Sequence, residues 1–223
     1  MNKSYFLLTI YFYLLISIVS INELISKDTH IDLLNKLNEN FPAEIYFNQI
    51  DNQNNLSKGW MIIGKKGLAR VEFEPPNHFI MVADGKWLIV HDAQYDRTSY
   101  FPLDGGILGA LLYPEKFKEV NQLNVIKKTV NDDSYFSLVS KNFQDTELRV
   151  FFDHEYQELK GWEIYENNET SIKINILKIN KVKSIEKLDK NIFKFPEFMR
   201  ANIKGFFGPY ERKLKKIPTS NTN

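Results

Sequence analysis

Cysteine is absent from the 223 residues of this chain. Disulfides, thiolate metal sites and a cysteine nucleophile are therefore excluded. Glycine and proline are also scarce, with 10 and 8 residues, whereas phenylalanine and tyrosine contribute 17 and 11. A chain rich in aromatic residues and poor in turn formers is typical of a β-rich fold with a large apolar interior.

The chain also has no excess of positive charge, since its formal net charge is +1. Nucleic-acid binding would require a basic face, and this balance gives no support for one. The motifs G-x-S-x-G, H-E-x-x-H and the P-loop do not occur. We therefore expect a protein without enzymatic activity, metal or cofactor. The histidines show no ligand spacing, and we interpret His91-Asp92 and Asp153-His154 as solvated strand ends; the other two are His30 and His78.

Near its start the chain has one positive charge, Lys3, followed by an uncharged apolar run that begins at Tyr5. This layout is typical of a secretory signal peptide over residues 1–20, with cleavage at Ser20 or Ser26. A run of about seventeen apolar residues also lies at the short end of what spans a bilayer, so an uncleaved membrane anchor is the alternative. Either interpretation places the rest of the chain outside the cytoplasm.

We predict one domain over residues 27–200 and a polar, flexible tail over residues 201–223. An amphipathic helix is expected over residues 28–40, where Ile31, Leu34 and Leu37 recur at helical spacing. Strands at residues 43–50 and 56–63 follow, separated by a polar loop.

The stretch from residue 59 to residue 112 organises the chain. Val71 and Phe73 alternate with Arg70 and Glu72, which predicts a strand with an apolar buried face and a charged wet face. The strand must end at Pro75-Pro76, because proline cannot donate to a neighbouring strand.

Two apolar runs, residues 79–82 and 87–90, form a predicted hairpin with a type I′ turn at Asp84-Gly85. This turn would pair Val82 with Trp87 and Ile80 with Ile89. The alternation leaves both faces of the hairpin apolar, and it does not decide which face points inward. One face holds Ile80, Val82, Trp87 and Ile89, and the other holds Phe79, Met81, Leu88 and Val90.

A further strand at residues 97–101 precedes a short apolar helix with three glycines nearby. Such a helix is marginal alone and depends on packing, so we predict a lid. Its apolar residues are Ile107, Leu108, Leu111 and Leu112.

The second half of the chain predicts more strands, and the total reaches about ten or eleven. This pattern indicates a mainly β fold in which one antiparallel sheet curls into an unclosed half-barrel, with small helices over an apolar cavity. Near the end, Phe193, Phe195 and Phe198 are expected to plug apolar space. The strands lie near residues 123–130, 135–140, 148–152, 159–165 and 172–176.

This order of parts resembles the periplasmic outer-membrane lipoprotein carrier (LolA) family, most closely its α-proteobacterial branch. The resemblance is carried by Gly59-Trp60-Met61-Ile62, by residues 66–76, by Val82-Ala83-Asp84-Gly85-Lys86 and by Phe101-Pro102-Leu103. The late Phe193-Lys194-Phe195 is similar to the closing F-x-F segment of the family. In the family, an arginine holds the lid closed, and its position corresponds to Gly64 or Lys65 here. Lys66 stands where the family usually has a proline.

The resemblance implies a monomeric periplasmic carrier that binds the acyl chains of lipoproteins in an apolar cavity. Its partners would be acylated lipoproteins, an inner-membrane lipoprotein-releasing transporter and an outer-membrane acceptor. The implied lipid-binding residues are Ala69, Val71, Phe73, Ile80, Val82, Trp87, Ile89, Ile107, Leu108, Leu111 and Leu112.

Two alternatives remain open on the same scaffold. One is a module for another apolar ligand, although an outer-membrane receptor would need a lipid-modified cysteine that this chain lacks. The other is a protein-interaction domain whose interior is filled by its own side chains.

Overall fold

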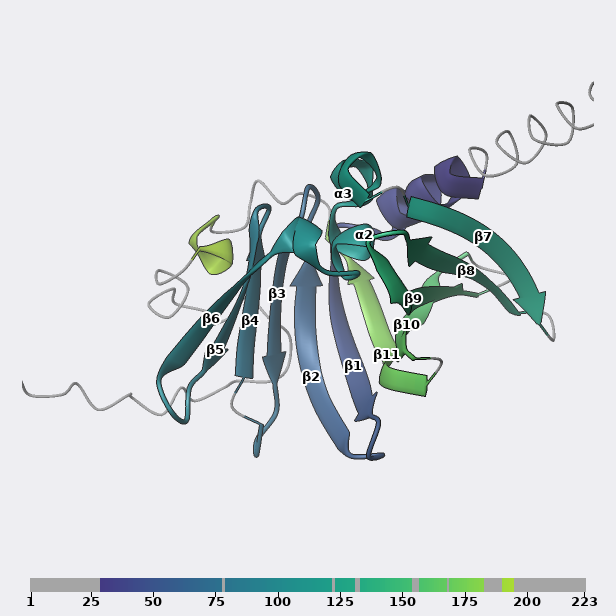
Figure 1. Ribbon diagram of the computed structural model, residues 1–223. Coiled ribbons are helices and arrows are strands. Elements are labelled where there is room, and N and C mark those ends of the chain that lie inside the picture. The colour runs from purple at the N-terminus through teal and green to yellow at the C-terminus, as the bar shows by residue number, and fades with distance from the viewer. Residues whose placement is uncertain are drawn as a thin grey trace, which may run out of the picture.

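The computed structural model describes residues 29–77, 79–121, 123–130, 133–153, 157–167, 169–182 and 190–194. One antiparallel sheet of eleven strands dominates the molecule (Figure 1), in the order β6-β5-β4-β3-β2-β1-β11-β10-β9-β8-β7. The strands are β1 (Ala43–Asp51), β2 (Leu56–Ile63), β3 (Leu68–Phe73), β4 (Phe79–Asp84), β5 (Trp87–Asp92), β6 (Arg97–Pro102), β7 (Leu123–Val130), β8 (Asp133–Ser140), β9 (Phe143–Phe152), β10 (Leu159–Glu166) and β11 (Glu169–Lys181).

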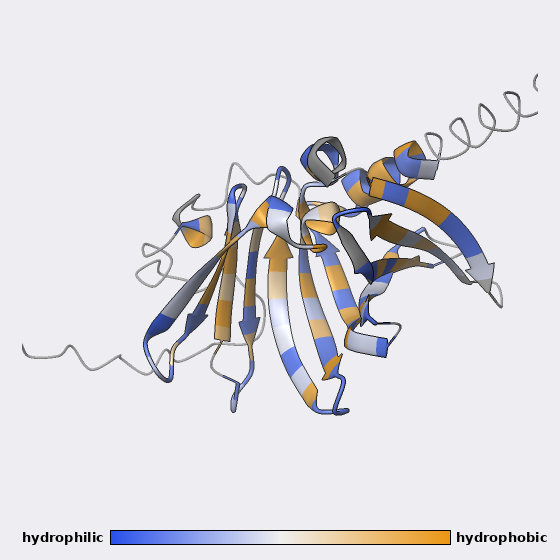
Figure 2. Cartoon of the chain, in the orientation of Figure 1, coloured by the Kyte–Doolittle hydropathy of each residue, from blue (hydrophilic) through white to orange (hydrophobic). Residues whose placement is uncertain are grey.

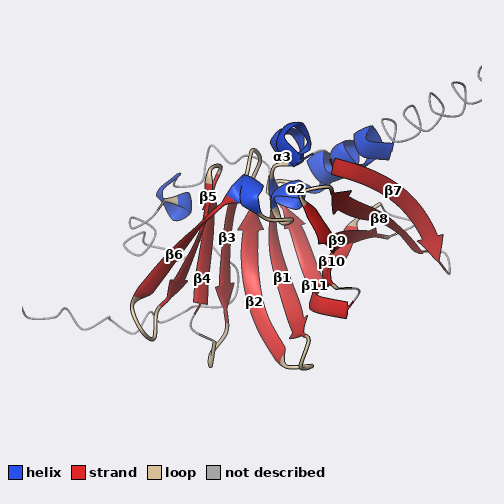
Figure 3. Ribbon diagram, in the orientation of Figure 1, coloured by secondary structure: helices blue, strands red, loops and turns tan. Residues whose placement is uncertain are grey.

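Nearly all pairings join strands that follow each other in the chain. The exception is the pairing of β1 with β11, which joins the two halves of the sheet and places Ala43 opposite Lys181. The strands β6 and β7 form the two edges of the described sheet and do not pair with each other, so the curled sheet stays open. The predicted unclosed half-barrel is therefore confirmed (Figure 3).

The helices lie in three places. A helix over residues 29–40 precedes β1, and three short helices connect the edge strand β6 to the edge strand β7 at the upper end of the sheet in Figure 1. The connecting helices are η1 (Leu103–Gly105), α2 (Gly109–Leu112) and α3 (Pro114–Asn121), and η3 (Lys190–Phe193) lies near the end of the described chain.

Two hydrophobic cores lie on opposite faces of the sheet. The larger core contains Leu37, Phe47, Leu111 and Phe136, and we call its side of the sheet the inner face. The smaller core lies on the outer face, where Trp60, Ile62, Val82 and Phe193 gather. Orange and blue positions alternate along several strands in Figure 2, as expected where successive side chains point to opposite faces.

The predicted strands of both halves are confirmed, with boundaries that differ by a few residues. The register of the β4–β5 hairpin is wrong in the prediction by two residues, because Val82 pairs with Ile89 and Ile80 pairs with His91. The turn is centred on Gly85 and Lys86, and only Gly85 has a positive φ, so the predicted type I′ turn, which needs a positive φ at both central residues, is wrong. Asp84 instead accepts hydrogen bonds from the backbone N–H groups of Lys86 and Trp87 at 2.9 and 2.7 Å.

The two-residue shift preserves parity, so the predicted grouping of the hairpin faces is correct. The positive φ angles that a type I′ turn requires occur two hairpins earlier, at Lys66 (57°) and Gly67 (78°) between β2 and β3.

Several predictions fall outside the described residues, namely the signal peptide or anchor, the tail after residue 200, and the packing of Phe195 and Phe198. The plug role of Phe193 is confirmed, since this side chain is buried. Over the described ranges, no helix is both long and apolar enough to cross a membrane.

Candidate functional site

The inner face of the sheet is divided into two unequal halves. Over β7–β10 the helix formed by residues 29–40 covers the sheet, and its Leu33 and Leu37 are buried in the larger core. Polar contacts hold this helix in place: Lys127 on β7 forms a 2.9 Å ion pair with Asp32, and Asn40 accepts a hydrogen bond from the Leu159 N–H at 3.0 Å. Over β7–β10, the inner face is therefore covered by the helix and packed with the protein's own side chains.

The half formed by β3–β5 is only partly covered. A row of apolar side chains there packs against the larger core and remains partly exposed. We call this row the apolar strip; it consists of Val71, Met81 and Leu88 on the strands and Leu108 and Leu112 at the lid.

The register shows that the strand residues of the apolar strip belong to one face. Val71 pairs with Met81, and Ala83 pairs with Leu88. The strip extends toward both ends of the sheet, because Phe101 is paired with Leu88 and Phe79 precedes Met81 by two residues on β4. Large apolar side chains that are partly exposed in a row are a common mark of a binding surface.

The lid over this half is the segment η1–α2–α3. Within this segment, Ile107, Ala110 and Leu111 are buried, whereas Leu108 and Leu112 are half-buried. Four helical residues in α2 cannot be stable in isolation, so packing against the sheet holds the lid.

Backbone hydrogen bonds fasten the lid to the hairpin turns. The Gly67 N–H donates to the Leu112 carbonyl at 2.9 Å, and the Leu103 N–H donates to the Lys86 carbonyl at 2.9 Å. The side chains of Lys65 and Lys66 are exposed.

The lid is closed in this structure. The space beside α2 is a cavity of about 10 Å³, lined by Leu103, Gly109 and Phe117 among others. That volume accommodates a single water molecule at most. A ligand larger than water could occupy this space only if α2 and its neighbours moved.

The predicted site residues fall on both faces of the sheet. The inner-face core contains Ala69 and Phe73, with Val71 packed against it, together with the lid residues Ile107, Leu108, Leu111 and Leu112. The hairpin residues Ile80 and Val82 lie in the outer-face core, with Ile89 paired to Val82, and Trp87 shares that face by alternation.

The hairpin residues nearest the lid are therefore those of the other face. Met81 and Leu88 pack against the inner core, and Val90 is paired with Met81. Alternation alone could group these residues, but only the pairing of Val71 with Met81 tells which group shares a face with β3.

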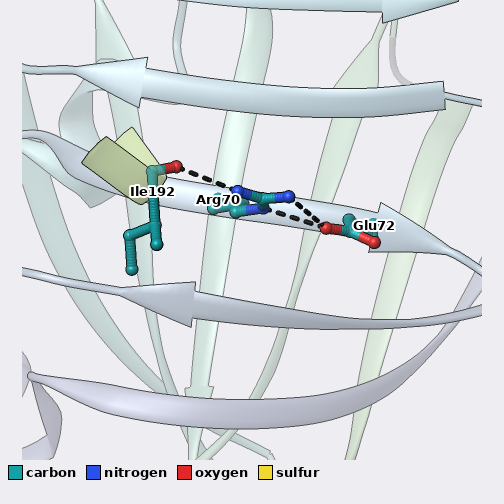
Figure 4. A network of polar contacts seen from close by, with 3 residues as sticks. All are labelled: Arg70, Glu72 and Ile192. Carbon is teal, nitrogen blue, oxygen red and sulfur yellow. Dashed lines mark hydrogen bonds and ion pairs between the residues drawn. The ribbon is translucent and has the colours of Figure 1, made fainter. Parts of the chain in front are cut away.

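The outer face contains a buried ion pair that the sequence prediction missed. Arg70 and Glu72 were expected to be wet, but they are 1% and 2% exposed. The Arg70 Nε and Nη2 groups donate to Glu72 Oε1 at 2.9 and 2.6 Å, and Nη1 donates to the Ile192 carbonyl at 3.4 Å (Figure 4). Residues of η3 cover the pair, so charge on a strand does not mark a solvent face here.

A second charged group lies on the half formed by β8–β11. Arg149 donates to Glu147 at 2.8 Å and stacks over the Tyr165 ring at 3.7 Å from its centre. The hydrogen bond from Arg149 lowers the pKa of the Glu147 carboxyl and raises the pKa of Arg149, whereas burial raises the pKa of Tyr165.

Metal-binding geometry does not occur in the part of the chain that the structure describes, where no three His, Asp or Glu side chains cluster. His91 was predicted to be a solvated strand end, but it is buried, and its Nδ1 lies 3.0 Å from Thr98 Oγ1. His78 and His154 are outside the described residues.

Comparison with known proteins gives the family. The family model "Outer membrane lipoprotein carrier protein LolA" matches residues 42–196. Among curated proteins, no significant match was found.

Three solved structures are similar to this chain at low sequence identity. An uncharacterized conserved protein from Thermus thermophilus is 9% identical with a TM-score of 0.44, over 70% of this chain and 88% of that one. A LolA superfamily protein from Nitrosomonas europaea is 10% identical with a TM-score of 0.42, over 73% of this chain and 96% of that one. A putative outer membrane lipoprotein-sorting protein domain from Vibrio parahaemolyticus is 12% identical with a TM-score of 0.44, over 73% of this chain and 95% of that one.

The open eleven-stranded sheet and its short helical lid agree with the match of the family model over residues 42–196, which is well over half of the 223 residues. The chain belongs to the outer membrane lipoprotein carrier protein LolA family.

Proposed function

We propose that this protein is a periplasmic carrier that holds the acyl chains of lipoproteins against the inner face of its half-barrel. The observation that carries the proposal is the apolar strip, which stays partly exposed beside the lid, whereas the helix formed by residues 29–40 covers the same face over β7–β10. Family membership supports the ligand class.

The energetics require such a surface. Each methylene moved from a membrane into water costs about 0.8 kcal/mol, so an acylated lipoprotein cannot cross an aqueous compartment unaided. Strands fix the shape of the binding face, and a four-residue helix fastened by main-chain hydrogen bonds opens at modest cost. An inner-membrane lipoprotein-releasing transporter would load the carrier, and an outer-membrane acceptor that binds more tightly would unload it.

The site in this proposal differs from the one expected from the sequence. It keeps Val71, Leu108 and Leu112 and adds Met81 and Leu88, with the core beneath the lid exposed on opening. It leaves out the hairpin residues of the outer face, which are Ile80, Val82, Trp87 and Ile89.

Native mass spectrometry of the chain, co-produced with a triacylated lipoprotein and purified from a bacterial periplasm, tests the proposal. We expect a one-to-one complex that detergent dissociates. A cargo variant in which the acylated cysteine is replaced by serine is the control, and it should not bind. Binding of the unacylated cargo with equal yield would contradict the carrier function.

The closed lid favours one alternative, a protein-interaction module with a filled interior. The cavity beside α2 has a volume of only about 10 Å³. The same experiment separates the two functions, because an interaction module would bind a protein partner whether or not that partner is acylated.

A further inference from the structure

A cleft of about 730 Å³ lies between the loops at the end of the sheet opposite to α2. Its walls come from the β1–β2, β3–β4 and β5–β6 connections, which lie at the lower end of the sheet in Figure 1. The volume is within the range of about 300–1,000 Å³ that is typical of ligand sites. Neither the lid nor the larger core contributes to this cleft.

Large apolar side chains gather around the cleft. Leu56, Phe79 and Tyr95 line it, and they are 58%, 41% and 62% exposed. A single exposed apolar residue needs no explanation, but three around one cleft indicate a surface that is covered in use.

The walls are held by local hydrogen bonds. The Phe79 N–H donates to Asn77 Oδ1 at 2.9 Å, and the Gln94 N–H donates to Asp92 Oδ1 at 2.9 Å. The Glu74 N–H donates to the Lys58 carbonyl at 2.7 Å, which joins β3 to β2 at the floor. A cleft shaped in this way loses little entropy when it binds a ligand.

The cleft is continuous with the apolar strip. Phe79 lines the cleft, and alternation along β4 places it on the same face as Met81, which pairs with Val71. A ligand that occupies the strip therefore meets the cleft at the end of the sheet remote from the lid.

A bound lipoprotein must leave the inner face somewhere, since its polypeptide is covalently attached to the acylated residue. At the lid end, Leu103 and Leu111 are buried, and the bond from Gly67 to Leu112 closes the rim. Over β7–β10, the helix formed by residues 29–40 covers the face. The cleft is at the uncovered end.

The chemistry of the lining favours a polypeptide over a lipid head group. Pro75 and Tyr95 offer flat apolar surfaces, and Asp92 and Glu74 outnumber the single ammonium of Lys58. Two carboxylates against one ammonium disfavour an anionic phosphate, whereas an extended neutral peptide fits both the apolar and the polar walls.

We propose that this cleft binds the extended polypeptide segment that directly follows the acylated residue of a bound lipoprotein. The proposal rests on the proposed carrier function and adds a second, peptide-binding subsite to it. The carrier would then bind the first residues of the cargo polypeptide as well as its acyl chains.

Two probes separate the subsites: a triacylated cysteine that carries a ten-residue uncharged peptide, and the same triacylated cysteine as a simple amide. Their affinities are measured for the chain purified from a bacterial periplasm. We expect the peptide-bearing probe to bind about tenfold more tightly, which corresponds to about 1.4 kcal/mol.

The double variant Leu56→Ser/Tyr95→Ser should abolish this tenfold difference and leave the affinity for the amide probe unchanged. The matched control is Tyr100→Ser/Ile126→Ser, which alters two similarly exposed side chains outside the cleft and should keep the difference. Both pairs are exposed, so all variants should fold.

Equal affinities of the two probes, or a tenfold difference that survives in the cleft variant, would overturn the peptide subsite while the carrier function stands. Failure of both probes to bind would overturn the carrier function, and the subsite with it.

Discussion

At the scale of single residues, Gly67 links a strained turn to the lid. Its φ of +78° lies in the left-handed region, and an added Cβ would lie 2.7 Å from Leu103 Cδ2 and 3.0 Å from the Cα of Gly85. The same residue donates the hydrogen bond that fastens the lid at Leu112. Gly67 is therefore required by the turn geometry, by the close packing and by the hydrogen bond that holds the lid.

We expect Gly67→Ala to lower the free energy of unfolding by about 1–3 kcal/mol, because it adds backbone strain and a clash with η1. Urea denaturation followed by tryptophan fluorescence measures the loss. Gly106→Ala is the control, since its backbone is extended (φ −149°) and nothing lies within 4 Å of an added Cβ. Equal stability of the Gly67 variant and the wild type would show that this turn relaxes freely.

The Arg70–Glu72 pair gives a second prediction at this scale. Replacing Glu72 by alanine removes the carboxylate that binds two nitrogens of a 1% exposed guanidinium. We expect a loss of about 3–5 kcal/mol, whereas the double variant Arg70→Met/Glu72→Leu should recover most of it, since no charge then stays buried. Chemical denaturation of both variants measures the difference.

The control for the ion pair is Glu147→Gln, because the pair of Glu147 with Arg149 has side chains that are 21% and 28% exposed. Its loss should be no more than about 1 kcal/mol. A Glu72 variant that loses no more than the Glu147 variant would mean that the outer-face charges are solvated in solution.

At the scale of elements, α2 is the part expected to move. Leu111 is 2% exposed, and a carboxylate cannot stay there, so Leu111→Glu should release the lid. The expected result is faster hydrogen exchange at residues 107–113 with unchanged protection in β1 and β2, together with weaker binding of acylated cargo.

Ile126→Glu is the control for the lid variant, because Ile126 is an exposed side chain on β7. Global unfolding of the Leu111 variant would show that α2 is not separable from the sheet. Unchanged cargo binding with a released lid would remove the lid from the mechanism.

At the scale of the whole molecule, we expect substitutions in one half of the inner face to affect mainly stability and substitutions in the other half to affect mainly ligand binding. Phe136 lies in the half under the helix of residues 29–40. Phe136→Ala should lower the free energy of unfolding by about 3–5 kcal/mol. It should have little effect on acyl binding at a temperature where the variant is folded.

Met81→Ser lies in the apolar strip and should cost less, at most about 2 kcal/mol, yet weaken acyl binding about tenfold. Thermal denaturation and titration with a triacylated lipopeptide measure both quantities. The reverse pattern would place the ligand in the half that the structure shows as filled.

The sequence by itself determined the local elements of this protein. Period-two alternation, proline stops and polar turns located most strands to within a few residues, and glycine-flanked leucines located the lid, because these signals depend only on near neighbours. The same patterns grouped the β4–β5 residues correctly by face, since a two-residue slip in the pairing preserves parity.

Only the tertiary structure decided which face points inward and what covers the other. Arg70 is buried because Ile192, 122 positions later, lies over it, and the sheet is joined by β1 and β11 from opposite ends of the domain. Alternation cannot distinguish a charged residue in water from one paired under a distant segment, or a hairpin's inner face from its outer one. Those choices depend on contacts between remote parts of the chain, and in this protein they define the candidate site.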